Sequence, residues 1–517
     1  MRFLYLTFYL TAMLIISTNR AYSDEIFIPA GTNDNQAGID GGEEDSDLSG
    51  PASLAYLGDK LLILDALNHR ILSAEADDKI GIYKNDLSGS PKDIVIVEDS
   101  VFIWDEGPKK LESKSNKLSS VDSSSNLGKF AASKFSQFGL WDDNIQESGR
   151  PSSFISSKAV SLTLPSANNS SVTISANRDA PNSVKLSIFQ RSTGDQCSIS
   201  IRRNSPYVSA VPLEIDNNNN LYLLVLNLLE DSNPIKVRGS IRRYNLSCDF
   251  NSEYVIPFEL MDENPKATLP SRFVAISKNG KVAFLIRMPT GTKVIELPIS
   301  HSSSDIETDK IYLYSILGSP TENKTGDDIV KRAQEYATEE WQLSKKNYRP
   351  DEESACNPPD KTWKRPVRLD GKIGRDIVGL PYNWGGGDTL QAFRRKIRDN
   401  SPAGNVCTSR STNTVRNDAA GIDCSGLASR AWDLKGRDDK ELKVGTSDLA
   451  KFGVDRKISQ LEPGDLINKA GSHVRIFSEL TNTGLVRIIE SSIDCGGACD
   501  RYLSLAHLYG YAGLHKK

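Results

Sequence analysis

Cys424 and His473 have the sequence surroundings of a nucleophile and its base. Cys424 stands in the run Gly-Ile-Asp-Cys-Ser-Gly, directly before apolar residues at helical spacing, and His473 opens a β-type run. A thiol at the start of a helix is favoured as thiolate, because the unpaired N–H groups and the helix dipole stabilise the anion. The thiolate attacks carbonyl carbon, and an imidazole accepts and returns the proton. The pair therefore predicts thiol-based attack on an acyl group.

A third residue follows from the hairpin expected after His473. Thr481 to Gly484 form a turn signal, and the returning strand brings Glu490 back beside His473, where it would orient the imidazole. Ser491 and Asp494 are rivals for this role, and a solvated strand residue is the alternative for Glu490. The other histidines of the chain lie in segments typical of packing, loops or the tail: His69, His301, His507 and His515. No histidine pair has the spacing of a zinc peptidase, so we expect no metal and no cofactor.

Cysteine parity also singles out Cys424. The chain has seven cysteines, an odd number for an oxidising compartment. Six of them can pair in order along the chain: Cys197 with Cys248, Cys356 with Cys407 and Cys495 with Cys499. This leaves Cys424 as the working thiol among structural disulfides. The alternative is that several cysteines are reduced and buried.

The first residues predict export. Arg2, the apolar run Phe3–Ile16 and the cleavage-type triplet Ala21-Tyr22-Ser23 indicate a signal peptide over residues 1–23. An uncleaved anchor helix is the alternative. No later apolar run has the length of a stable membrane span, so we expect a periplasmic or secreted protein. A net charge of -4 and the lack of a long basic tract give no support to nucleic acid as a partner.

Residues 24–320 predict an all-β domain. Strand, short turn and strand recur, as in Leu61–Asp65 with its flanking runs and Leu221–Val225. The unit from Gly50-Pro51 through Asp65 to Asn68-His69-Arg70-Ile71 resembles a blade of an NHL-type β-propeller. We expect about five to seven blades, and two β-sandwich domains are the alternative. Such a module would bind an unknown protein or glycan.

Residues 321–366 predict a helical linker. Apolar residues recur at helical spacing within Asp327–Tyr348, and the Pro-rich segment Arg349–Pro366 marks a domain boundary. Residues 367–517 alternate helical and strand patterns and predict an α+β domain.

The C-terminal motifs carry a family resemblance. Tyr382-x-Trp384-Gly385-Gly386, Asp423-Cys424-Ser425-Gly426, Leu461-x-Pro463-Gly464-Asp465-Leu466 and His473-Val474-x-Ile476 are similar, in this order, to motifs of the NlpC-type cell-wall cysteine peptidases. The resemblance implies a papain-like domain that cleaves amide bonds in peptidoglycan stem peptides. The chain is thus expected to be multidomain, with an all-β propeller-like region followed by this α+β domain.

The resemblance also implies a role for each site residue. Cys424 would be the nucleophile and His473 the general base and then acid, while Glu490 stands where the family has a polar third residue. Tyr382 would stabilise the oxyanion together with the Cys424 N–H, and Asp423 and Ser425 would hold the free amine of a stem peptide.

Three departures from the family leave the substrate open. The segment Gly387–Ile422 is much longer than usual and carries a basic run at Arg394, which favours a solvated helix face over an anion site. It would be a lid, a specificity loop or a block of the cleft. Glu490 is charged where the usual residue is not acidic, and Gly445 replaces a frequent Arg. The alternatives are an inactive scaffold of the cell envelope and an acyltransferase or amidase.

Overall fold

The chain is described from a computed structural model. The structure describes residues 25–39, 50–74, 79–85, 87, 91, 93–97, 99–104, 108–112, 118–120, 160–165, 171–180, 183–202, 207–228, 234–256, 270–300, 324–350, 363–407, 415–436, 440–480 and 485–517. The predicted signal peptide over 1–23 lies outside the described residues. Within them, no helix combines the length and the apolar character needed to cross a membrane.

The N-terminal region consists of small antiparallel sheets. Its described elements are β1 (Glu25–Pro29), β2 (Ser53–Leu57), β3 (Lys60–Asp65), β4 (Arg70–Ala74), β5 (Ile80–Lys84), β6 (Asp93–Val97), β7 (Ser100–Trp104), β8 (Pro108–Leu111), β9 (Leu118–Ser120), β10 (Val160–Pro165), β11 (Ser171–Ala180), β12 (Ser183–Gln190), β13 (Gln196–Arg202), β14 (Val208–Ile215), β15 (Asn220–Leu228), β16 (Val237–Asn245), β17 (Phe250–Ile256), η3 (Pro270–Phe273), β18 (Val274–Ile276), β19 (Val282–Met288), β20 (Gly291–Glu296) and β21 (Ile299–Ser300).

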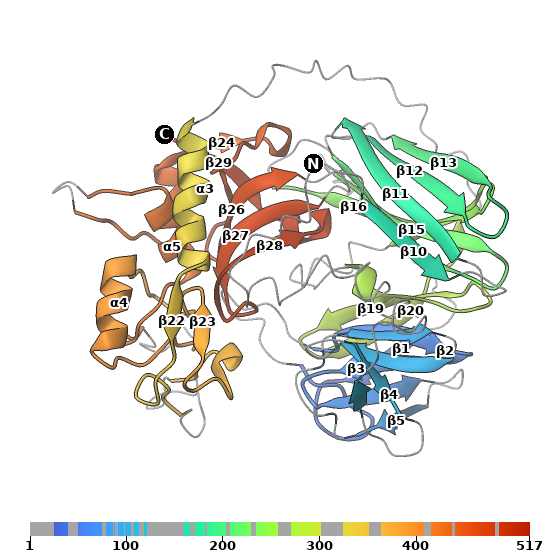
Figure 1. Cartoon of the computed structure of the whole chain (residues 1–517), viewed down its shortest axis with the longest axis horizontal. Helices are drawn as coiled ribbons and strands as arrows, with labels where there is room; N and C mark the ends of the chain where they lie inside the picture. The colour runs from blue at the N-terminus through green and yellow to red at the C-terminus, as the bar shows by residue number, and fades with distance from the viewer. Residues whose placement is uncertain are drawn as a thin grey trace, which may run out of the picture.

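These strands pair mainly with their sequence neighbours. In the described part, β2–β5, β6–β9 and β10–β13 each form a four-stranded sheet, and β14–β17 form a sheet with β21. The first strand pairs with β20 in the order β1-β20-β19-β18, so the beginning and the end of the region share one sheet (Figure 1). This organisation is propeller-like, in agreement with the predicted repeat of short strands.

The blade-like motif around β3 is structural. Asp65 is fully buried and accepts hydrogen bonds from the Gly38 N–H (3.0 Å), Asn68 Nδ2 (2.8 Å) and Arg70 Nε (3.0 Å). Arg70 also donates to the Gln36 carbonyl at 2.7 Å. A buried carboxylate needs such partners. These hydrogen bonds connect the turn after β3 to the segment around Gln36 and Gly38.

The C-terminal region places helices against one six-stranded sheet. Its elements are α3 (Lys324–Ala337), β22 (Glu340–Gln342), η5 (Val367–Leu369), β23 (Asp376–Val378), α4 (Leu390–Arg398), α5 (Cys424–Ala431), η6 (Leu449–Lys451), β24 (Gly453–Arg456), η7 (Ile458–Gln460), β25 (Leu466–Lys469), β26 (His473–Leu480), β27 (Val486–Ser492), β28 (Gly497–Leu503), η8 (Leu505–Leu508) and β29 (Ala512–Lys516). The sheet order is β24-β29-β25-β26-β27-β28, and α3 and α5 pack against β26 and β27 (Figure 1).

The helix α3 differs from the predicted linker. It ends at Ala337, well before Tyr348, and β22 then pairs with β23. Its apolar residues Ile329, Ala333 and Tyr336 are buried in one cluster with α5 and the sheet. Because burying this face against α5 stabilises it, α3 belongs to the C-terminal region.

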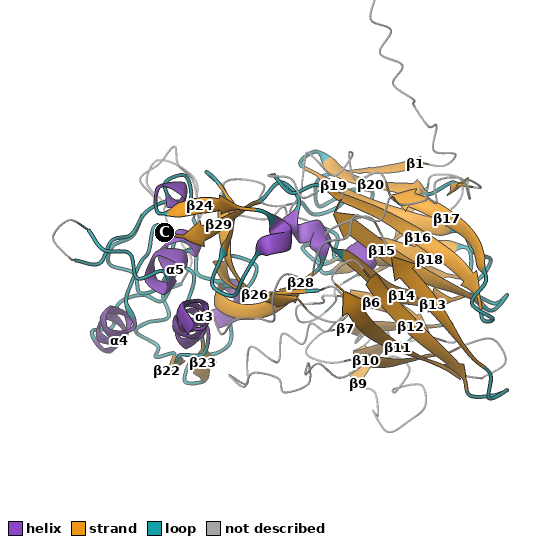
Figure 2. Ribbon diagram, turned by 90° about the horizontal axis from the view of Figure 1, so that it is seen from above, coloured by secondary structure: helices purple, strands orange, loops and turns teal. Residues whose placement is uncertain are grey.

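The two regions are joined by packing and by backbone hydrogen bonds. The Ile235 N–H donates to the Tyr511 carbonyl at 2.8 Å, and the Gly510 N–H donates to the Ile235 carbonyl at 2.8 Å. Ile235 also shares a buried apolar cluster with Leu505 and Leu508 of η8. The sheet containing β26 and β28 therefore lies between its own helices and the propeller-like region (Figure 2).

Candidate active site

The thiol of Cys424 lies at the first residue of α5. Asp423 is the N-cap in an extended conformation, and its Oδ1 accepts the Gly426 N–H at 2.6 Å. An N-cap carboxylate satisfies one of the otherwise unpaired N–H groups of the first turn. Cys424 is 1% exposed and is the cysteine that stays outside disulfides in the described chain. The structure therefore places the thiol as the sequence predicts.

His473 is the first residue of β26, against which α5 packs. Cys424 shares a buried apolar cluster with Val474, the neighbour of His473. His473 Nε2 lies 2.8 Å from Glu490 Oε2. Because an ionised carboxylate only accepts hydrogen bonds, Nε2 carries the proton and the Nδ1 lone pair is available as a base. Nδ1 is buried and has no hydrogen-bond partner among the described residues.

Glu490 reaches His473 through the predicted hairpin. The strands β26 and β27 are antiparallel, with Ile476 opposite Ile489, and the turn between them lies outside the described residues. The structure thus brings His473 and Glu490 together, whereas Asp494 pairs with Arg501 and the Ser491 hydroxyl donates to the Ile422 carbonyl.

Two arginines compensate the buried charge of Glu490. Arg475 Nε lies 2.9 Å from Glu490 Oε2, and Arg501 forms an ion pair with Oε1. Burial by itself would raise the pKa of Glu490, but the Arg501 and Arg475 guanidinium groups and the hydrogen bond from His473 hold it well below its usual range. Glu490 is therefore an ionised acceptor for the imidazole.

The same surroundings disfavour the charged imidazole. Burial lowers the pKa of His473 below its ordinary value, and the nearby Arg475 and Arg501 lower it further, against the raising effect of Glu490. His473 is consequently neutral at pH 7 and is suited to accept a proton at Nδ1.

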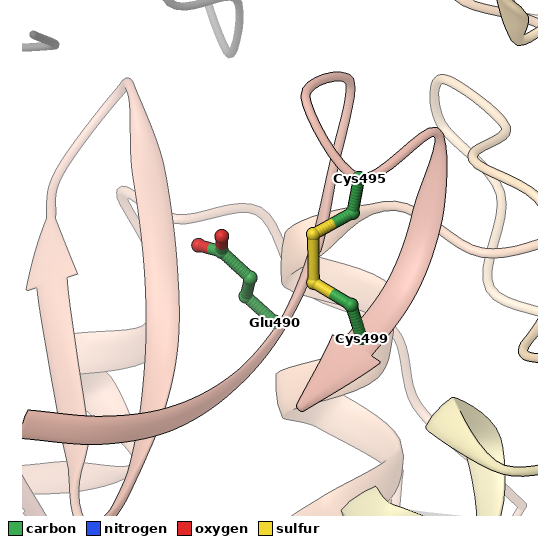
Figure 3. Close-up of side chains that lie close together, drawn as sticks. All are labelled: Glu490, Cys495 and Cys499. Atoms are coloured by element: carbon green, nitrogen blue, oxygen red, sulfur yellow. A yellow bond between two sulfur atoms is a disulfide. The ribbon is translucent and has the colours of Figure 1, made fainter. Parts of the chain in front are cut away.

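A disulfide supports Glu490 from the next strand. Cys499 of β28 lies opposite Glu490 in the sheet, and Cys495 and Cys499 are bonded (Figure 3). Glu490 and the two sulfurs lie within 4.8 Å of one another. Since the sulfurs are joined, they do not offer the thiolates that a metal ion needs.

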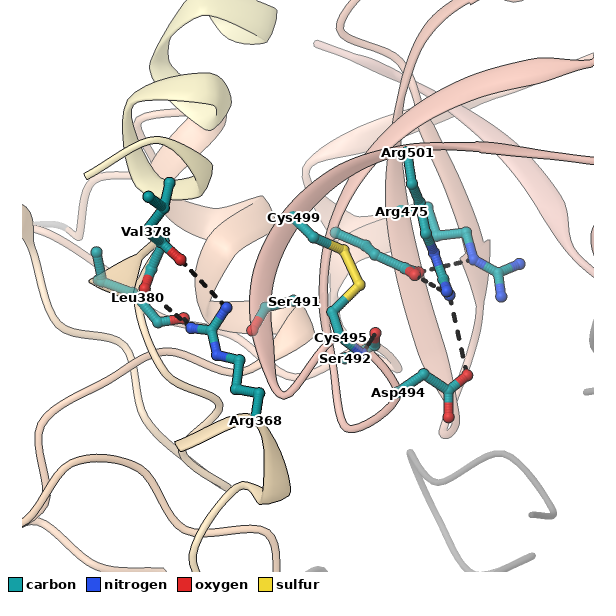
Figure 4. Close-up of a disulfide and its surroundings, with 12 residues drawn as sticks. Arg368, Val378, Leu380, Arg475, Ser491, Ser492, Asp494, Cys495, Cys499 and Arg501 are labelled. Carbon is teal, nitrogen blue, oxygen red and sulfur yellow. Dashed lines mark hydrogen bonds and ion pairs between the residues drawn. A yellow bond between two sulfur atoms is a disulfide. The ribbon is translucent and has the colours of Figure 1, made fainter. Parts of the chain in front are cut away.

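The disulfide loop also contacts the segment that precedes the site. The Gly496 carbonyl accepts the Tyr382 N–H at 3.0 Å, and Gly497 forms a bridge with Pro381. A Cβ on Gly497 would lie 2.1 Å from the Leu380 carbonyl oxygen, so only glycine permits this approach. Arg368 lies against Gly496 and Gly497 as well. Figure 4 shows it donating to the Val378 and Leu380 carbonyls.

Tyr382 is held beside the start of α5 by its backbone. It is fully buried and pairs in parallel with Ile422, two residues before Cys424. This position is compatible with the oxyanion role implied by the resemblance, which stays a prediction.

Asp423 and Ser425 form a polar pair at the helix start, with a partner that the sequence did not reveal. The Ser425 hydroxyl donates to Asp423 Oδ1 at 3.0 Å, and Lys443 Nζ lies 2.7 Å from Asp423 Oδ2. An ammonium group of the chain itself thus contacts the carboxylate that was expected to hold a substrate amine.

The described parts of the long segment, residues 387–407 and 415–422, are held by ion pairs and by backbone hydrogen bonds to the Tyr382 region. Its helix α4 carries the basic run, in which Arg394 pairs with Glu339 and Lys396 with Asp388. The Asn405 N–H donates to the Tyr382 carbonyl at 2.8 Å. These pairings account for part of the basic run without a bound anion.

Sequence reasoning missed Arg475, Arg501 and Lys443. Arg475 could have been found, because residues two apart on a strand share a face, which puts it beside His473. Arg501 and Lys443 arrive from β28 and from a loop, and no local pattern links them to the site.

The predicted disulfides agree with the structure where they are described. Cys197–Cys248 and Cys495–Cys499 are confirmed. Cys407 is disulfide-bonded, and its predicted partner Cys356 lies outside the described residues.

Comparison with known proteins gives no family for this chain. No family model and no curated protein matches it. Among solved structures, a streptogramin B lyase is 9% identical, with 53% of this chain and 98% of that chain covered and a TM-score of 0.22. A gluconolactonase from Xanthomonas campestris is 8% identical, with 53% and 94% covered and a TM-score of 0.21. Virginiamycin B lyase from Staphylococcus aureus is 11% identical, with 54% and 99% covered and a TM-score of 0.21. Such TM-scores carry no argument, so the propeller-like description rests on the sheets themselves.

Proposed function

We propose that the chain is an exported cysteine hydrolase that cleaves amide bonds in peptidoglycan stem peptides. The observation that carries the proposal is the arrangement at α5 and β26. A buried thiol starts a helix that packs on the strand whose first residue, His473, is oriented through Nε2 by Glu490. The order of motifs similar to NlpC-type peptidases supports a papain-like domain and the cell-wall substrate. The propeller-like region would bind a protein or glycan and present the substrate.

The residues suggest a sequence of proton transfers. His473 Nδ1 accepts the proton of the Cys424 thiol, and the thiolate attacks the amide carbonyl carbon. The oxyanion that forms is stabilised by the N–H groups at the start of α5 and by Tyr382. The imidazolium then donates its proton to the leaving amine, and water, deprotonated by His473, hydrolyses the thioester and restores the thiol.

Glu490 has a restricted role in this scheme. Two arginines contact its carboxylate and offset its negative charge. Glu490 therefore mainly orients the imidazole and contributes less to stabilising the imidazolium. The resting imidazole is therefore neutral, and it becomes charged when it accepts the thiol proton.

Digestion of purified peptidoglycan tests the proposal. The wild-type chain should release fragments with new amino and carboxyl ends, detected by mass spectrometry, and Cys424→Ala should release none. His515→Asn, in a half-exposed histidine of the same region that bonds to Asp465, is the matched control and should keep activity. Undiminished release by Cys424→Ala would refute the assignment.

The alternative is a binding or scaffold protein of the cell envelope without hydrolase activity. The burial of Cys424, 1% exposed, favours it. An active thiol should react with iodoacetamide well below pH 8.5, the range of an ordinary cysteine. A thiol that reacts only above that range, together with intact peptidoglycan, would support the scaffold.

A further inference from the structure

Asp423, which directly precedes the proposed nucleophile, forms an ion pair with Lys443. Asp423 Oδ1 accepts the Gly426 N–H at 2.6 Å and the Ser425 hydroxyl at 3.0 Å. Asp423 Oδ2 lies 2.7 Å from Lys443 Nζ, and the Asp423 side chain is only 4% exposed. Both oxygens of a buried carboxylate are therefore engaged, one by the helix start and one by the lysine.

Without a paired cation, the Asp423 carboxylate would disfavour ionisation of the Cys424 thiol. A like charge within about 4–6 Å disfavours an anion and can raise the pKa of a thiol by roughly 1–3 units. Asp423 precedes Cys424 directly and caps the helix that Cys424 begins, so its carboxylate is a like charge next to the residue that must ionise. An ammonium group in contact with the carboxylate opposes this effect.

Lys443 is held in place by the start of the long segment. A Cβ added to Gly387 would lie 2.8 Å from Lys443 Cδ, so the methylene stem of the lysine lies against that glycine. The Gly387 carbonyl in turn accepts Arg430 Nε of α5 at 2.9 Å. The segment thus contributes to the placement of the ammonium group beside Asp423.

The other charged groups near α5 pair with groups other than Asp423. Arg332 of α3 donates to the Ala431 carbonyl at the far end of the helix, and Arg430 of α5 pairs with Glu441 at 3.2 Å. The charged or titratable groups on the strands at this end are His473 and Arg475 on β26, Glu490 on β27 and Arg501 on β28. These four form their own paired cluster and leave the Asp423 charge to Lys443.

We propose that Lys443 is a positioning residue of the site, which neutralises Asp423 and thereby allows Cys424 to reach the thiolate state. The inference rests on the proposed role of Cys424 as nucleophile. It assigns Lys443 an electrostatic action through Asp423, without contact with the substrate.

A double-mutant cycle of Lys443 and Asp423 tests this electrostatic effect on the Cys424 thiol. The readout is the ultraviolet absorbance of the thiolate as a function of pH in the full chain, with the Cys424→Ala background subtracted. Lys443→Met should raise the midpoint by about 1 pH unit, because the Asp423 charge is left uncompensated. Asp423→Asn should lower it, because Asn still caps the helix while the ammonium group remains. The double variant should return close to the wild-type midpoint.

Two controls separate charge from folding. Lys443→Arg keeps the charge and should keep the midpoint. Lys451→Met removes the cation of an exposed lysine–aspartate pair, Lys451 with Asp448 at 2.5 Å, and should change nothing. A merely structural role predicts shifts in the same direction for Lys443→Met and Asp423→Asn. That result, or an unchanged midpoint in Lys443→Met, would overturn the inference. The titration needs no substrate, so its outcome is independent of whether peptidoglycan is cleaved.

Discussion

Glu490 offers the sharpest test of how the site is held together. Its carboxylate is fully buried and contacts His473, Arg475 and Arg501. Glu490→Gln keeps the shape but removes the charge that compensates two guanidinium groups. Breaking a buried ion pair by removing one partner costs about 3–5 kcal/mol, because the remaining charge stays desolvated. We expect a loss of this size in the free energy of unfolding.

The matched control is Glu479→Gln on the neighbouring strand. Glu479 is 47% exposed and lies 3.3 Å from Arg487. An exposed pair contributes about 0–1 kcal/mol, so this variant should unfold close to the wild type. Both are measured by urea unfolding of the full chain, followed by the fluorescence of its six tryptophans, of which Trp432 lies at the end of α5.

Glu490→Gln should also reduce hydrolysis. The amide can present its NH₂ group to His473 Nε2, which would move the ring proton to Nδ1 and block the base. General acid–base catalysis contributes about 10²–10⁴-fold, so we expect a loss of at least about 10²-fold in rate. A Glu490→Gln chain as stable and as active as Glu479→Gln would refute the buried-cluster reasoning.

Two further predictions concern disulfides and pH. The Cys197–Cys248 bridge closes a sequence separation of 51 residues and the Cys495–Cys499 bridge one of 4, so loop entropy assigns them about 4 and about 2 kcal/mol. Replacing the first pair by serine should therefore lower the urea midpoint of its region more than replacing the second, and the reverse order would contradict this estimate. Burial, with Arg475 and Arg501 adding to it, lowers the pKa of His507 to about 3, so between pH 6.5 and pH 3 the unfolded chain binds a proton that the folded chain does not. Stability should fall by about 2 kcal/mol from pH 7 to pH 5 through this group, and His507→Gln, measured by urea unfolding at both pH values, should remove that part of the slope; an unchanged slope would contradict it.

The sequence was sufficient to predict those parts of the site that depend on residues close together in the chain. Leu427, Ala428 and Ala431 at helical spacing predicted the helix that begins at Cys424, because burying that face is what forms it. The hairpin expected after His473 predicted the contact between His473 and Glu490, because the pairing of two antiparallel strands brings their residues side by side.

Long-range partners could not be predicted in the same way. Lys443 reaches Asp423 from a loop 20 residues later in the chain, where its stem packs on Gly387. The end of α3 at Ala337 was also missed, because β22 is fixed by its pairing with β23 and not by its own sequence pattern. Such contacts follow from tertiary packing and leave no periodic signal.

Attack of the Cys424 thiol on an amide carbonyl leaves a covalent acyl-enzyme, which can be trapped. Soluble peptidoglycan fragments are mixed with the full chain, quenched with acid at short times, and the protein is mapped by mass spectrometry. We expect an acyl group in thioester linkage on the peptide that contains Cys424, formed as amine is released. The Cys424→Ala chain should give neither the acylated peptide nor the amine. Release of amine at the wild-type rate by Cys424→Ala, or an acyl group on a different residue, would contradict it.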